Sequence, residues 1–374
     1  MTNTTIAIIG NQGFSLLNFR GPLIEDLVRS GYRVIALAPD MDEASAKGLH
    51  SLGAEPVSIW LSRTGVNPLA DFLALLLLFL KLVEIRPDVT LSYAAKPAIY
   101  GTLAAWFARV PRRYAMIEGL GNVFIEQPRE KVRKKLLRRF VANLYKSALK
   151  RADKVFFLNP DDICDFASRR LVSLVQVVRI NGIGVDLSTW RSLPAFTETI
   201  TFTFVGRLLR DKGILDFAAA ARVVKNSAPQ VRFLILGDLD SNPDAISLSE
   251  VRGWVEEGIV EWPGHVPVRD HLARTSVFVL PSRREGVPRS TQEAMASAKP
   301  VITTDAPGCR ETVIHGQNGF LVPPGDVVAL ASAMQHFIEN PVLIASMGAA
   351  SRRLAEERFD VRKTNARISR TMGL

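Results

Sequence analysis

Short apolar runs of strand length alternate along this chain with longer segments whose apolar residues recur with the period of an α-helix. The apolar runs predict strands at Ile6–Ile9, Arg33–Ala38, Val89–Ser92, Arg113–Ile117, Val155–Leu158, Thr201–Val205, Arg232–Leu236, Val277–Leu280 and Val301–Thr303. The helical patterns predict helices at Leu23–Ser30, Ala44–Leu52, Pro68–Ile85, Ile99–Phe107, Val132–Arg151, Asp211–Asn226, Arg269–Arg274, Thr291–Ser297 and Val327–Glu339. This alternation is typical of an α/β fold, in which helices cover both faces of a parallel sheet.

A break in the pattern near the middle of the chain predicts two domains. With 374 residues the chain exceeds the length that one hydrophobic core usually serves. The motif Asn181-Gly-Ile-Gly-Val-Asp186 is followed by an irregular polar stretch that reaches Thr199, and we expect the hinge there. We predict doubly wound domains over residues 1–183 and 184–350 that face one another across a ligand cleft. The helical tail, residues 351–374, is expected to pack back across the boundary.

Composition narrows the class of protein. Apolar residues make up 47% of the chain and charged residues 22%, which excludes a disordered protein. The two cysteines, Cys164 and Cys309, form neither a disulfide framework nor a metal-binding cluster, and we interpret Cys309 as a spectator thiol. The apolar run Leu73–Leu80 is too short to span a bilayer, so it predicts a buried or interfacial helix. We expect a cytoplasmic chain without a secretory signal, either soluble or attached to the inner face of the plasma membrane.

Positive charge is concentrated in one predicted helix. Residues 1–190 hold 25 Lys and Arg against 17 Asp and Glu, and seven bases with one acid lie between Arg129 and Arg139. Apolar residues share the other face of this helix: Val132, Leu136, Phe140 and Leu144. A basic amphipathic helix suits an anionic membrane surface or a lipid-linked diphosphate. The alternative is a helix that packs into the core and keeps a solvated basic face. Nucleic acid is not an expected partner, because no stacking aromatics are interleaved with the bases.

The segment from Glu285 to Glu293 carries the strongest candidate site. It reads Glu-Gly-Val-Pro-Arg-Ser-Thr-Gln-Glu and follows the predicted strand Val277–Leu280, so two carboxylates stand eight positions apart at the carboxyl end of a strand. Ligands bind at that end of an open α/β sheet. Hydroxyl-rich ligands need fixed acceptors, which two glutamates can supply. Ser290 and Glu293 also have the spacing of a capping box, so Glu293 taken alone is equally consistent with a helix cap.

A second candidate site is cationic. The strand Thr201–Val205 leads through Gly206 into Arg207-Leu-Leu-Arg-Asp-Lys212-Gly213 and then into a helix. Cations and unpaired backbone N–H groups at a helix start form an anion site that suits a diphosphate, although solvated charges at a helix start are the alternative. Asp238-Leu-Asp240 has the form found in metal-dependent sugar-nucleotide enzymes. Because Arg207 and Lys212 already supply the counter-charge, we interpret Asp238–Asp240 as a polar loop and expect no metal.

Weaker candidates follow strands in the N-terminal half. Gly10-Asn-Gln-Gly13 is a glycine-rich turn that would let a ligand phosphate approach the backbone. Arg20 lies just beyond it, as a cleft residue or an ordinary residue of a helix start. Glu118 and Lys96 also follow predicted strands, and each is equally consistent with a ligand contact and with a loop residue that has no role.

Together these motifs resemble family 4 of the retaining glycosyltransferases, which have the two-domain GT-B fold. The resemblance rests on the pair Glu285 and Glu293, on the Gly206–Gly213 loop and on Asn181–Asp186. It also rests on the segment from Gly308-Cys-Arg-Glu-Thr-Val to Gly316-Gln-Asn-Gly-Phe-Leu-Val-Pro323. Ala95-Lys-Pro-Ala-Ile-Tyr-Gly101 and Glu118-Gly-Leu-Gly121 resemble a bacterial subgroup that acts on polyprenyl-diphosphate-linked saccharides. The resemblance covers the whole chain and is strongest over residues 200–330.

The resemblance implies roles for individual residues. Arg207 and Lys212 would neutralise the donor diphosphate, Glu285 would contact the donor sugar, and Glu293 would bind the ribose. The residues expected to bind the donor also include Gly286, Val287 and Pro288, together with Gly13 of the glycine-rich turn. Glu118 would join Arg207, Lys212 and Glu285 in the catalytic set, on the acceptor side, where many family members have a histidine. No cofactor is implied, because the nucleotide sugar is a substrate.

The expected function is that of a retaining, metal-independent glycosyltransferase of bacterial surface polysaccharide assembly (capsule, exopolysaccharide or the O-antigen of lipopolysaccharide). It would move a hexose or N-acetylhexosamine from a nucleotide sugar, with UDP the expected nucleotide, to a saccharide acceptor that is lipid-diphosphate-linked. An anionic membrane surface is the further expected partner, through Arg129 to Arg139. Two alternatives stay open at this point: a sugar-nucleotide 2-epimerase on the same fold, and a basic membrane-binding module without catalysis.

Overall fold

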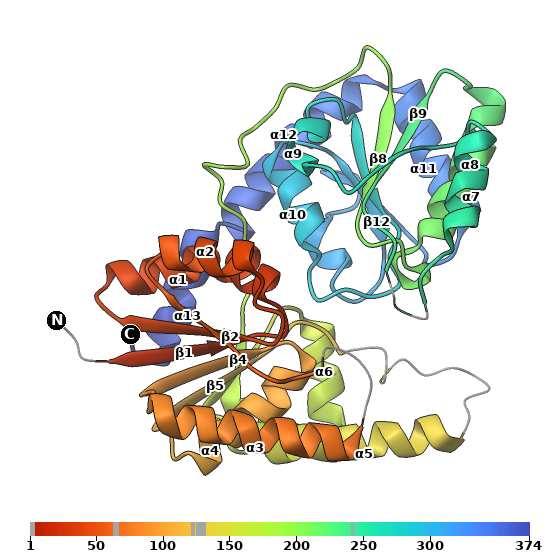
Figure 1. Cartoon of the computed structure of the whole chain (residues 1–374). Helices are drawn as coiled ribbons and strands as arrows, with labels where there is room; N and C mark the ends of the chain where they lie inside the picture. The colour runs from red at the N-terminus through yellow and green to blue at the C-terminus, as the bar shows by residue number, and fades with distance from the viewer. Residues whose placement is uncertain (1–3, 63–66, 121–123, 125–131, 241, 243) are drawn as a thin grey trace. The chain divides into compact units, whose positions relative to one another are not determined.

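The computed structural model describes residues 4–62, 67–120, 124, 132–240, 242 and 244–374. The backbone forms two compact units (Figure 1). The first unit comprises Met1–Ile180 together with Arg362–Leu374, and the second comprises Asn181–Val361. Within the first unit, side-chain hydrogen bonds anchor the returning C-terminal segment. Asn365 donates to Asp26 at 2.8 Å, and Arg112 donates to the carbonyl of Met372 at 3.0 Å.

The first unit is built on a parallel sheet with the strand order β3-β2-β1-β4-β5-β6-β7. Its strands are β1 (Thr5–Ile9), β2 (Arg33–Ala38), β3 (Glu55–Ser58), β4 (Val89–Tyr93), β5 (Arg112–Ile117), β6 (Lys154–Phe157) and β7 (Val177–Arg179). Its helices are α1 (Gly13–Arg29), α2 (Glu43–Ser51), α3 (Pro68–Ile85), η1 (Pro97–Gly101), α4 (Thr102–Phe107), α5 (Val132–Leu149), α6 (Pro160–Ser168), η3 (Leu174–Gln176) and α13 (Val361–Met372). Figure 1 shows α1, α2 and α13 on one face of the sheet and α3, α4 and α5 on the other.

The second unit repeats this design with the strand order β10-β9-β8-β11-β12-β13, again parallel. Its strands are β8 (Thr201–Val205), β9 (Arg232–Leu236), β10 (Glu261–Gly264), β11 (Val277–Leu280), β12 (Val301–Thr304) and β13 (Gly319–Val322). Its helices are η4 (Arg210–Lys212), α7 (Ile214–Ser227), α8 (Leu248–Glu256), α9 (Val268–Leu272), α10 (Arg289–Ala296), η5 (Arg310–Thr312), α11 (Val327–Glu339) and α12 (Val342–Arg358). The predicted architecture of two doubly wound α/β domains is confirmed.

Burial explains which strands the sequence predicted. Every residue of β1 and of β8 is buried, because helices cover both faces of each sheet, so most residues of these strands are apolar. The four strands that we did not predict, β3, β7, β10 and β13, are the outer strands of the two sheets. They are short and partly exposed, so they lack that apolar signal.

Both sheets reverse their strand order at one point, between β1 and β4 in the first unit and between β8 and β11 in the second. In doubly wound folds, ligands bind at the carboxyl ends of the strands that flank such a reversal. The loop Gly10–Gly13 follows β1, the loop with Arg207 and Lys212 follows β8, and the loop with Glu285 follows β11. The topology therefore brings the two strongest candidate segments of the second unit to the same edge of one sheet.

Helix α1 begins ten residues earlier than the predicted start at Leu23. Pro22 lies inside this helix, directly before the predicted start. The helix begins at Gly13 because the Asp40 carboxylate accepts the Gly13 N–H at 2.8 Å. Arg20 therefore belongs to the middle of α1, and its interpretation as a residue of a helix start is wrong.

Across the described ranges, no single helix is long and apolar enough to cross a membrane. By length and composition alone, α11 and α12 pass that test only as a pair, which is bent by 110° at the break between them.

Candidate functional site

Three loops meet at the carboxyl edge of the second unit's sheet. The loop after β11 is tied to the loop after β8, because the Arg283 N–H donates to the carbonyl of Asp211 at 2.8 Å. It is tied to the loop after β12 as well, because the Glu285 N–H donates to the carbonyl of Pro307 at 3.0 Å. These backbone hydrogen bonds fix the segment that carries Glu285 between its two neighbours.

Two glycines permit this close approach. Gly213 has φ of 74°, and a Cβ there would lie 2.0 Å from the carbonyl oxygen of Pro281. Gly308 also has φ of 74°, and a Cβ there would lie 2.1 Å from the carbonyl oxygen of Glu285. Any other residue would be strained at both positions and would push the loops apart. Both glycines belong to the motifs that carried the family resemblance, so those motifs encode the packing of the loops.

The predicted cation and carboxylate of this site are in direct contact. The Lys212 Nζ lies 2.5 Å from the Glu285 Oε1, and their side chains are only 21% and 11% exposed. The ammonium group of Lys212, on the loop after β8, thus contacts the carboxylate of Glu285, on the loop after β11. An ion pair so little exposed is screened weakly by water, so both groups are held in defined positions.

Arg207 lies on the same loop but faces solvent. Its Nη1 is 2.9 Å from the Asp240 Oδ2, and its side chain is 54% exposed while that of Asp240 is 8% exposed. A guanidinium has five N–H donors, so this contact leaves Arg207 able to bind an anion. We interpreted Asp238–Asp240 as a polar loop, and in the structure Asp240 orients Arg207.

Glu293 lies on α10, where the predicted capping box is wrong. The helix begins at Arg289 after Pro288 and has no side-chain cap, so Ser290 is already inside the first turn. Ser290 donates instead to the carbonyl of Val205 at 3.1 Å. The Glu293 carboxylate pairs with Arg289 at 2.8 Å, one turn away along the helix. Burial raises the pKa of Glu293, and the neighbouring Arg289 opposes that shift.

Gln292 supports the same loop and was not among the predicted residues. Its Nε2 donates to the carbonyl of Val287 at 3.1 Å, and its Oε1 accepts the N–H of Gly184 at 3.1 Å. The amide therefore ties the Glu285–Pro288 loop to the Asn181–Asp186 motif. No sequence signal distinguishes Gln292 from a surface glutamine, because both partners are backbone groups far away along the chain.

In the first unit, the candidates Gly13 and Glu118 also have protein partners. The Gly13 N–H is occupied by Asp40, as described above. Glu118 follows β5 and accepts a hydrogen bond from Arg20, whose side chain is 3% exposed. The Arg20 guanidinium also lies over the ring of Tyr93, 4.5 Å from its centroid. Arg20 is therefore a buried cation that fixes Glu118 at the carboxyl end of the sheet, a role that the sequence left open.

Lys96 is the cation for a buried carboxylate. Its Nζ lies 2.7 Å from the Oδ1 of Asp71, the one acidic residue in the first turn of α3. Asp71 is almost fully buried, so it needs this partner. The structure thus gives Lys96 a stabilising role inside the first unit.

The basic helix exposes its apolar face. In α5 the side chains of Val132, Leu136 and Phe140 are 72%, 58% and 42% exposed. The alternative of a core-packed helix is therefore wrong for its N-terminal half. Arg129 and the two residues after it lie outside the described residues, and so does the side chain of Lys134. Gly121, the last residue of the Glu118–Gly121 motif, also lies outside them.

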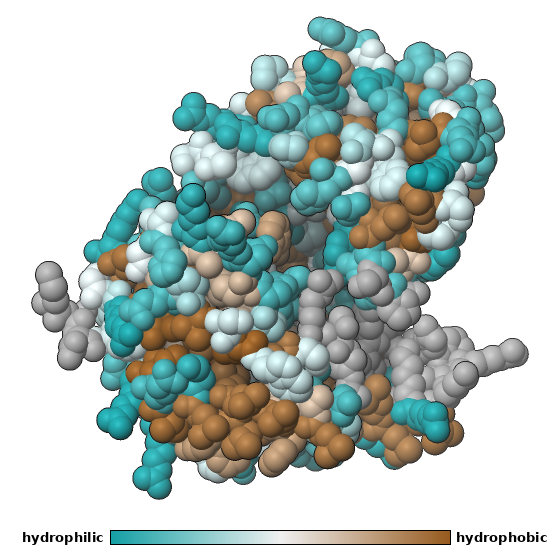
Figure 2. Space-filling view, viewed as in Figure 1, coloured by the Kyte–Doolittle hydropathy of each residue, from teal (hydrophilic) through white to brown (hydrophobic). Residues whose placement is uncertain are grey.

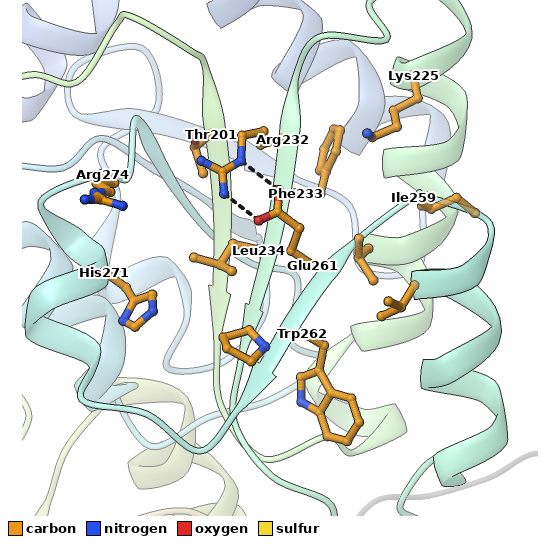
Figure 3. Close-up of a pocket in the computed structure, with 14 residues that line it drawn as sticks. Thr201, Lys225, Arg232, Phe233, Leu234, Ile259, Glu261, Trp262, His271 and Arg274 are labelled. Carbon is orange, nitrogen blue, oxygen red and sulfur yellow. Dashed lines mark hydrogen bonds and ion pairs between the residues drawn. The ribbon is translucent and has the colours of Figure 1, made fainter.

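A pocket of about 540 Å³ lies elsewhere on the second unit (Figure 3). It is lined by the first residues of three strands, namely Thr201 of β8, Arg232 of β9 and Glu261 of β10. Arg232 and Glu261 are paired across it at 2.7 Å. This pocket opens at the amino ends of the strands, at the opposite edge from Glu285, so it is not part of the candidate site.

The described part of the chain contains no group of three or more His, Cys, Asp or Glu side chains that could hold a metal ion. Cys309 lies beneath the loops, fully buried, and burial raises the pKa of its thiol to about 12. A thiol in such surroundings is almost entirely protonated at neutral pH, so it is a poor nucleophile.

Two sequence-family profiles match the chain in succession. "Glycosyl transferase 4-like domain" matches residues 21–180, and "Glycosyl transferases group 1" matches residues 199–340. The chain belongs to this glycosyltransferase family. The second profile contains the loops with Arg207, Lys212, Glu285 and Glu293, so the candidate site lies in the region that defines the family.

Curated relatives share this assignment. The chain is 27% identical over 353 residues to the N,N'-diacetylbacillosaminyl-diphospho-undecaprenol alpha-1,3-N-acetylgalactosaminyltransferase of Campylobacter jejuni, covering 90% of each chain. It is 25% identical over 293 residues to the UDP-Gal:alpha-D-GlcNAc-diphosphoundecaprenol alpha-1,3-galactosyltransferase of Escherichia coli, covering 74% of this chain and 73% of that one.

Solved structures agree on the fold. The HepE protein of Anabaena, solved in complex with UDP, superposes with a TM-score of 0.77 at 20% identity and covers 99% of this chain and 100% of its own. The sucrose-phosphate synthase of Thermosynechococcus elongatus superposes with a TM-score of 0.79 at 20% identity, over 99% of this chain and 98% of its own. The predicted GT-B fold is confirmed.

Proposed function

We propose that this glycosyltransferase moves a hexose or N-acetylhexosamine from a UDP-sugar to a saccharide carried on a lipid diphosphate, in the assembly of a bacterial surface polysaccharide. The observation that carries the proposal is the pairing of Lys212 with Glu285 beside Arg207 at the strand-order reversal of the second unit. The names of the two curated relatives support the substrates, since both contain a diphospho-undecaprenol acceptor and one contains UDP-Gal.

Two cations would bind the diphosphate of the donor, and two carboxylates would accept hydrogen bonds from its hydroxyl groups. Arg207 and Lys212 would bind the diphosphate through charge-assisted hydrogen bonds. Glu285 would accept hydrogen bonds from the sugar, and Glu293 from the ribose. The backbone of Gly286, Val287 and Pro288 would line the site, because Gln292 holds this segment in place.

The proposed reaction retains the configuration at the anomeric carbon. The bond from sugar C1 to the phosphate oxygen breaks, and the acceptor hydroxyl oxygen bonds to C1 on the same face. The acceptor's proton passes to the departing phosphate oxygen, so UDP leaves and no side chain has to act as the base. Lys212 and Arg207 stabilise the charge that develops on the leaving group, without a metal ion. The alpha linkage in both relatives' names supports retention, because it is the product expected from an alpha-linked donor.

The first unit would receive the acceptor. Glu118, which is paired with Arg20 at the carboxyl edge of its sheet, would accept a hydrogen bond from a saccharide hydroxyl. The basic segment Arg129 to Arg139 would attract the anionic membrane surface in which a lipid-linked acceptor resides. We propose a peripheral location on the cytoplasmic side of that membrane, where nucleotide sugars are available.

Binding of UDP is the first test of this function. We expect UDP at 100 times its dissociation constant to raise the apparent stability by about 2.7 kcal/mol, which thermal unfolding detects as a shift of several degrees. GDP at the same concentration should produce little shift. A shift with GDP and none with UDP would contradict the assignment of the donor.

The two alternatives left open by the sequence receive no support from the comparisons. The family profiles and the relatives named above are transferases. An epimerase would convert the donor in the absence of any acceptor, and a non-catalytic module would bind membranes without affinity for a nucleotide sugar. The UDP titration, followed by analysis of the sugar product, separates these three functions.

A further inference from the structure

Helix α3 exposes one long apolar face. Its inner face is formed by Asp71, Ala74, Leu78 and Leu82, which are buried. The opposite face carries large apolar side chains that are exposed: Leu69, Phe72, Leu73, Leu76, Leu77, Leu80 and Val83. Leu69 is 83% exposed, Phe72 is 67% exposed, and the other five are between 40% and 52% exposed. A core-packed helix normally presents polar residues on that side, so this face is unusual.

The apolar face continues onto the neighbouring helix. Trp106 and Phe107 of α4 are 39% and 53% exposed, and α4 packs against α3. Figure 2 shows hydrophobic residues gathered over α3 and α4 of the first unit. Contiguous exposed apolar surface of this extent marks an interaction site in proteins that are otherwise polar on the outside.

Positive charge accompanies this surface. Side chains of α3, α4 and α5 contribute to the same core cluster, through Ala74, Leu103 and Tyr145, so the three helices cover the same face of the sheet. On α5, Arg133, Lys135 and Arg139 are exposed. The chain as a whole has a formal net charge of +10. An apolar face flanked by exposed bases matches an anionic lipid surface, whereas a second copy of the chain would bring the same excess of positive charge.

We propose that α3 lies in the plane of an anionic membrane, with the face from Leu69 to Val83 in the boundary between headgroups and acyl chains. The bases of α5 would contact lipid phosphates beside it. A helix of 18 residues is about 27 Å long, so its whole length can lie flat on the bilayer. In-plane helices bind by burying an apolar face to a shallow depth and by attraction of basic residues to anionic lipids, and both components are present here.

Membrane binding by α3 would bring the enzyme to the surface that carries a lipid-linked acceptor. In this respect the inference rests on the proposed function. Vesicle binding is measured without donor or acceptor. A failure to bind vesicles would therefore leave UDP binding unaffected, and a failure to bind UDP would leave vesicle binding unaffected.

The test uses the full chain and sedimentation with vesicles of phosphatidylcholine, with or without one third phosphatidylglycerol. We expect the wild type to bind the anionic vesicles, and the variant Phe72→Gln/Leu76→Gln/Leu80→Gln to lose at least about tenfold in its partition coefficient. The matched control is Val328→Gln/Val342→Gln, which removes two apolar side chains of the second unit that are 79% and 76% exposed. This control should bind vesicles like the wild type.

A second variant separates the electrostatic component. Arg133→Gln/Lys135→Gln/Arg139→Gln should lose the preference for phosphatidylglycerol and the sensitivity of binding to salt, while residual binding through α3 persists. Loss of binding in the α5 variant together with normal binding in the α3 variant would overturn the role of α3.

Other outcomes also decide the proposal. Wild-type chain that stays in the supernatant with anionic vesicles overturns it. A wild-type dimer in light scattering that the α3 variant converts to a monomer, without vesicle binding, assigns the face to a second copy instead. Thermal unfolding checks that each variant is folded. Should the triple α3 variant unfold, the single substitution Leu76→Ser at an exposed position provides the same comparison.

Discussion

Replacing Lys212 with alanine is expected to lower kcat for sugar transfer by about 100- to 1,000-fold while the fold stays intact, since removing one donor that stabilises a developing anion has that effect in other enzymes. The Lys212 side chain is only 21% exposed, and its contact with Glu285 fixes its position. Its charge would stabilise the departing diphosphate in the transition state more than in the bound donor. The loss should therefore be seen in kcat as well as in kcat/KM.

The measurement is the initial rate of sugar transfer from UDP-sugar, with circular dichroism to check folding. The matched control is Arg222→Ala, which removes another ion-paired cation of the second unit. Arg222 contacts Glu257 at 2.5 Å, and both side chains are about half exposed. Surface pairs of this kind contribute little, so this variant should keep the wild-type rate. Near-normal turnover in Lys212→Ala would remove the diphosphate role of that residue.

The second large effect is expected from Glu293→Gln, which should raise KM for the donor by about 10- to 100-fold, as the loss of hydrogen bonds to a charged acceptor predicts. Glutamine keeps the size of the side chain and an oxygen for Arg289, so the helix should be preserved. The ribose is far from the bond that breaks, so kcat should change much less than KM.

The pH dependence of donor binding distinguishes this role from a structural one. Ribose hydroxyls donate more strongly to Glu293 when its carboxyl group is ionised, because the charged carboxylate is the stronger acceptor. Burial raises the pKa of Glu293, so protonation occurs at higher pH than for an exposed glutamate, and donor affinity should fall as the pH is lowered through that raised value. Glu293→Gln should abolish this dependence. If KM of the wild type and of the variant respond identically to pH, Glu293 does not bind the ribose.

The sequence predicted the inner strands of both sheets and missed the outer ones for a physical reason. Strands such as β1 and β8 are buried on both faces, so most of their residues are apolar and the local pattern reveals them. The outer strand β10 has the sequence Glu-Trp-Pro-Gly, which contains two residues that disfavour strands. It is held by pairing with β9 rather than by its own propensity, and pairing between distant segments is invisible in a local pattern.

The charged residues of the candidate site were predicted, but their partners were not. Lys212 and Glu285 lie in segments that follow strands, and Glu293 lies on the helix after Glu285, so the topology places all three at one edge of the sheet. Asp240 and Gln292 contact groups far away along the chain, so only the folded structure identifies them. The mistaken capping box has a local cause, since the structure begins α10 directly after Pro288, which shifts Ser290 out of the capping position.

The sequence likewise could not predict that one apolar face of α3 is exposed. A run of leucines predicts equally a helix buried on all sides and a helix that lies at an interface. Only the packing of Ala74, Leu78 and Leu82 into the sheet decides that the opposite face is exposed.

In the proposed function, the cations after β8 bind the diphosphate of a uridine nucleotide sugar. Titration calorimetry with UDP and with uridine tests this most directly, because the two ligands differ only in the diphosphate. For the wild type we expect UDP to bind at least about 100-fold more tightly than uridine, since two charge-assisted contacts contribute about 1.5–3 kcal/mol each. In Lys212→Ala that ratio should fall by about tenfold or more while the affinity for uridine stays the same. An unchanged ratio would contradict the account.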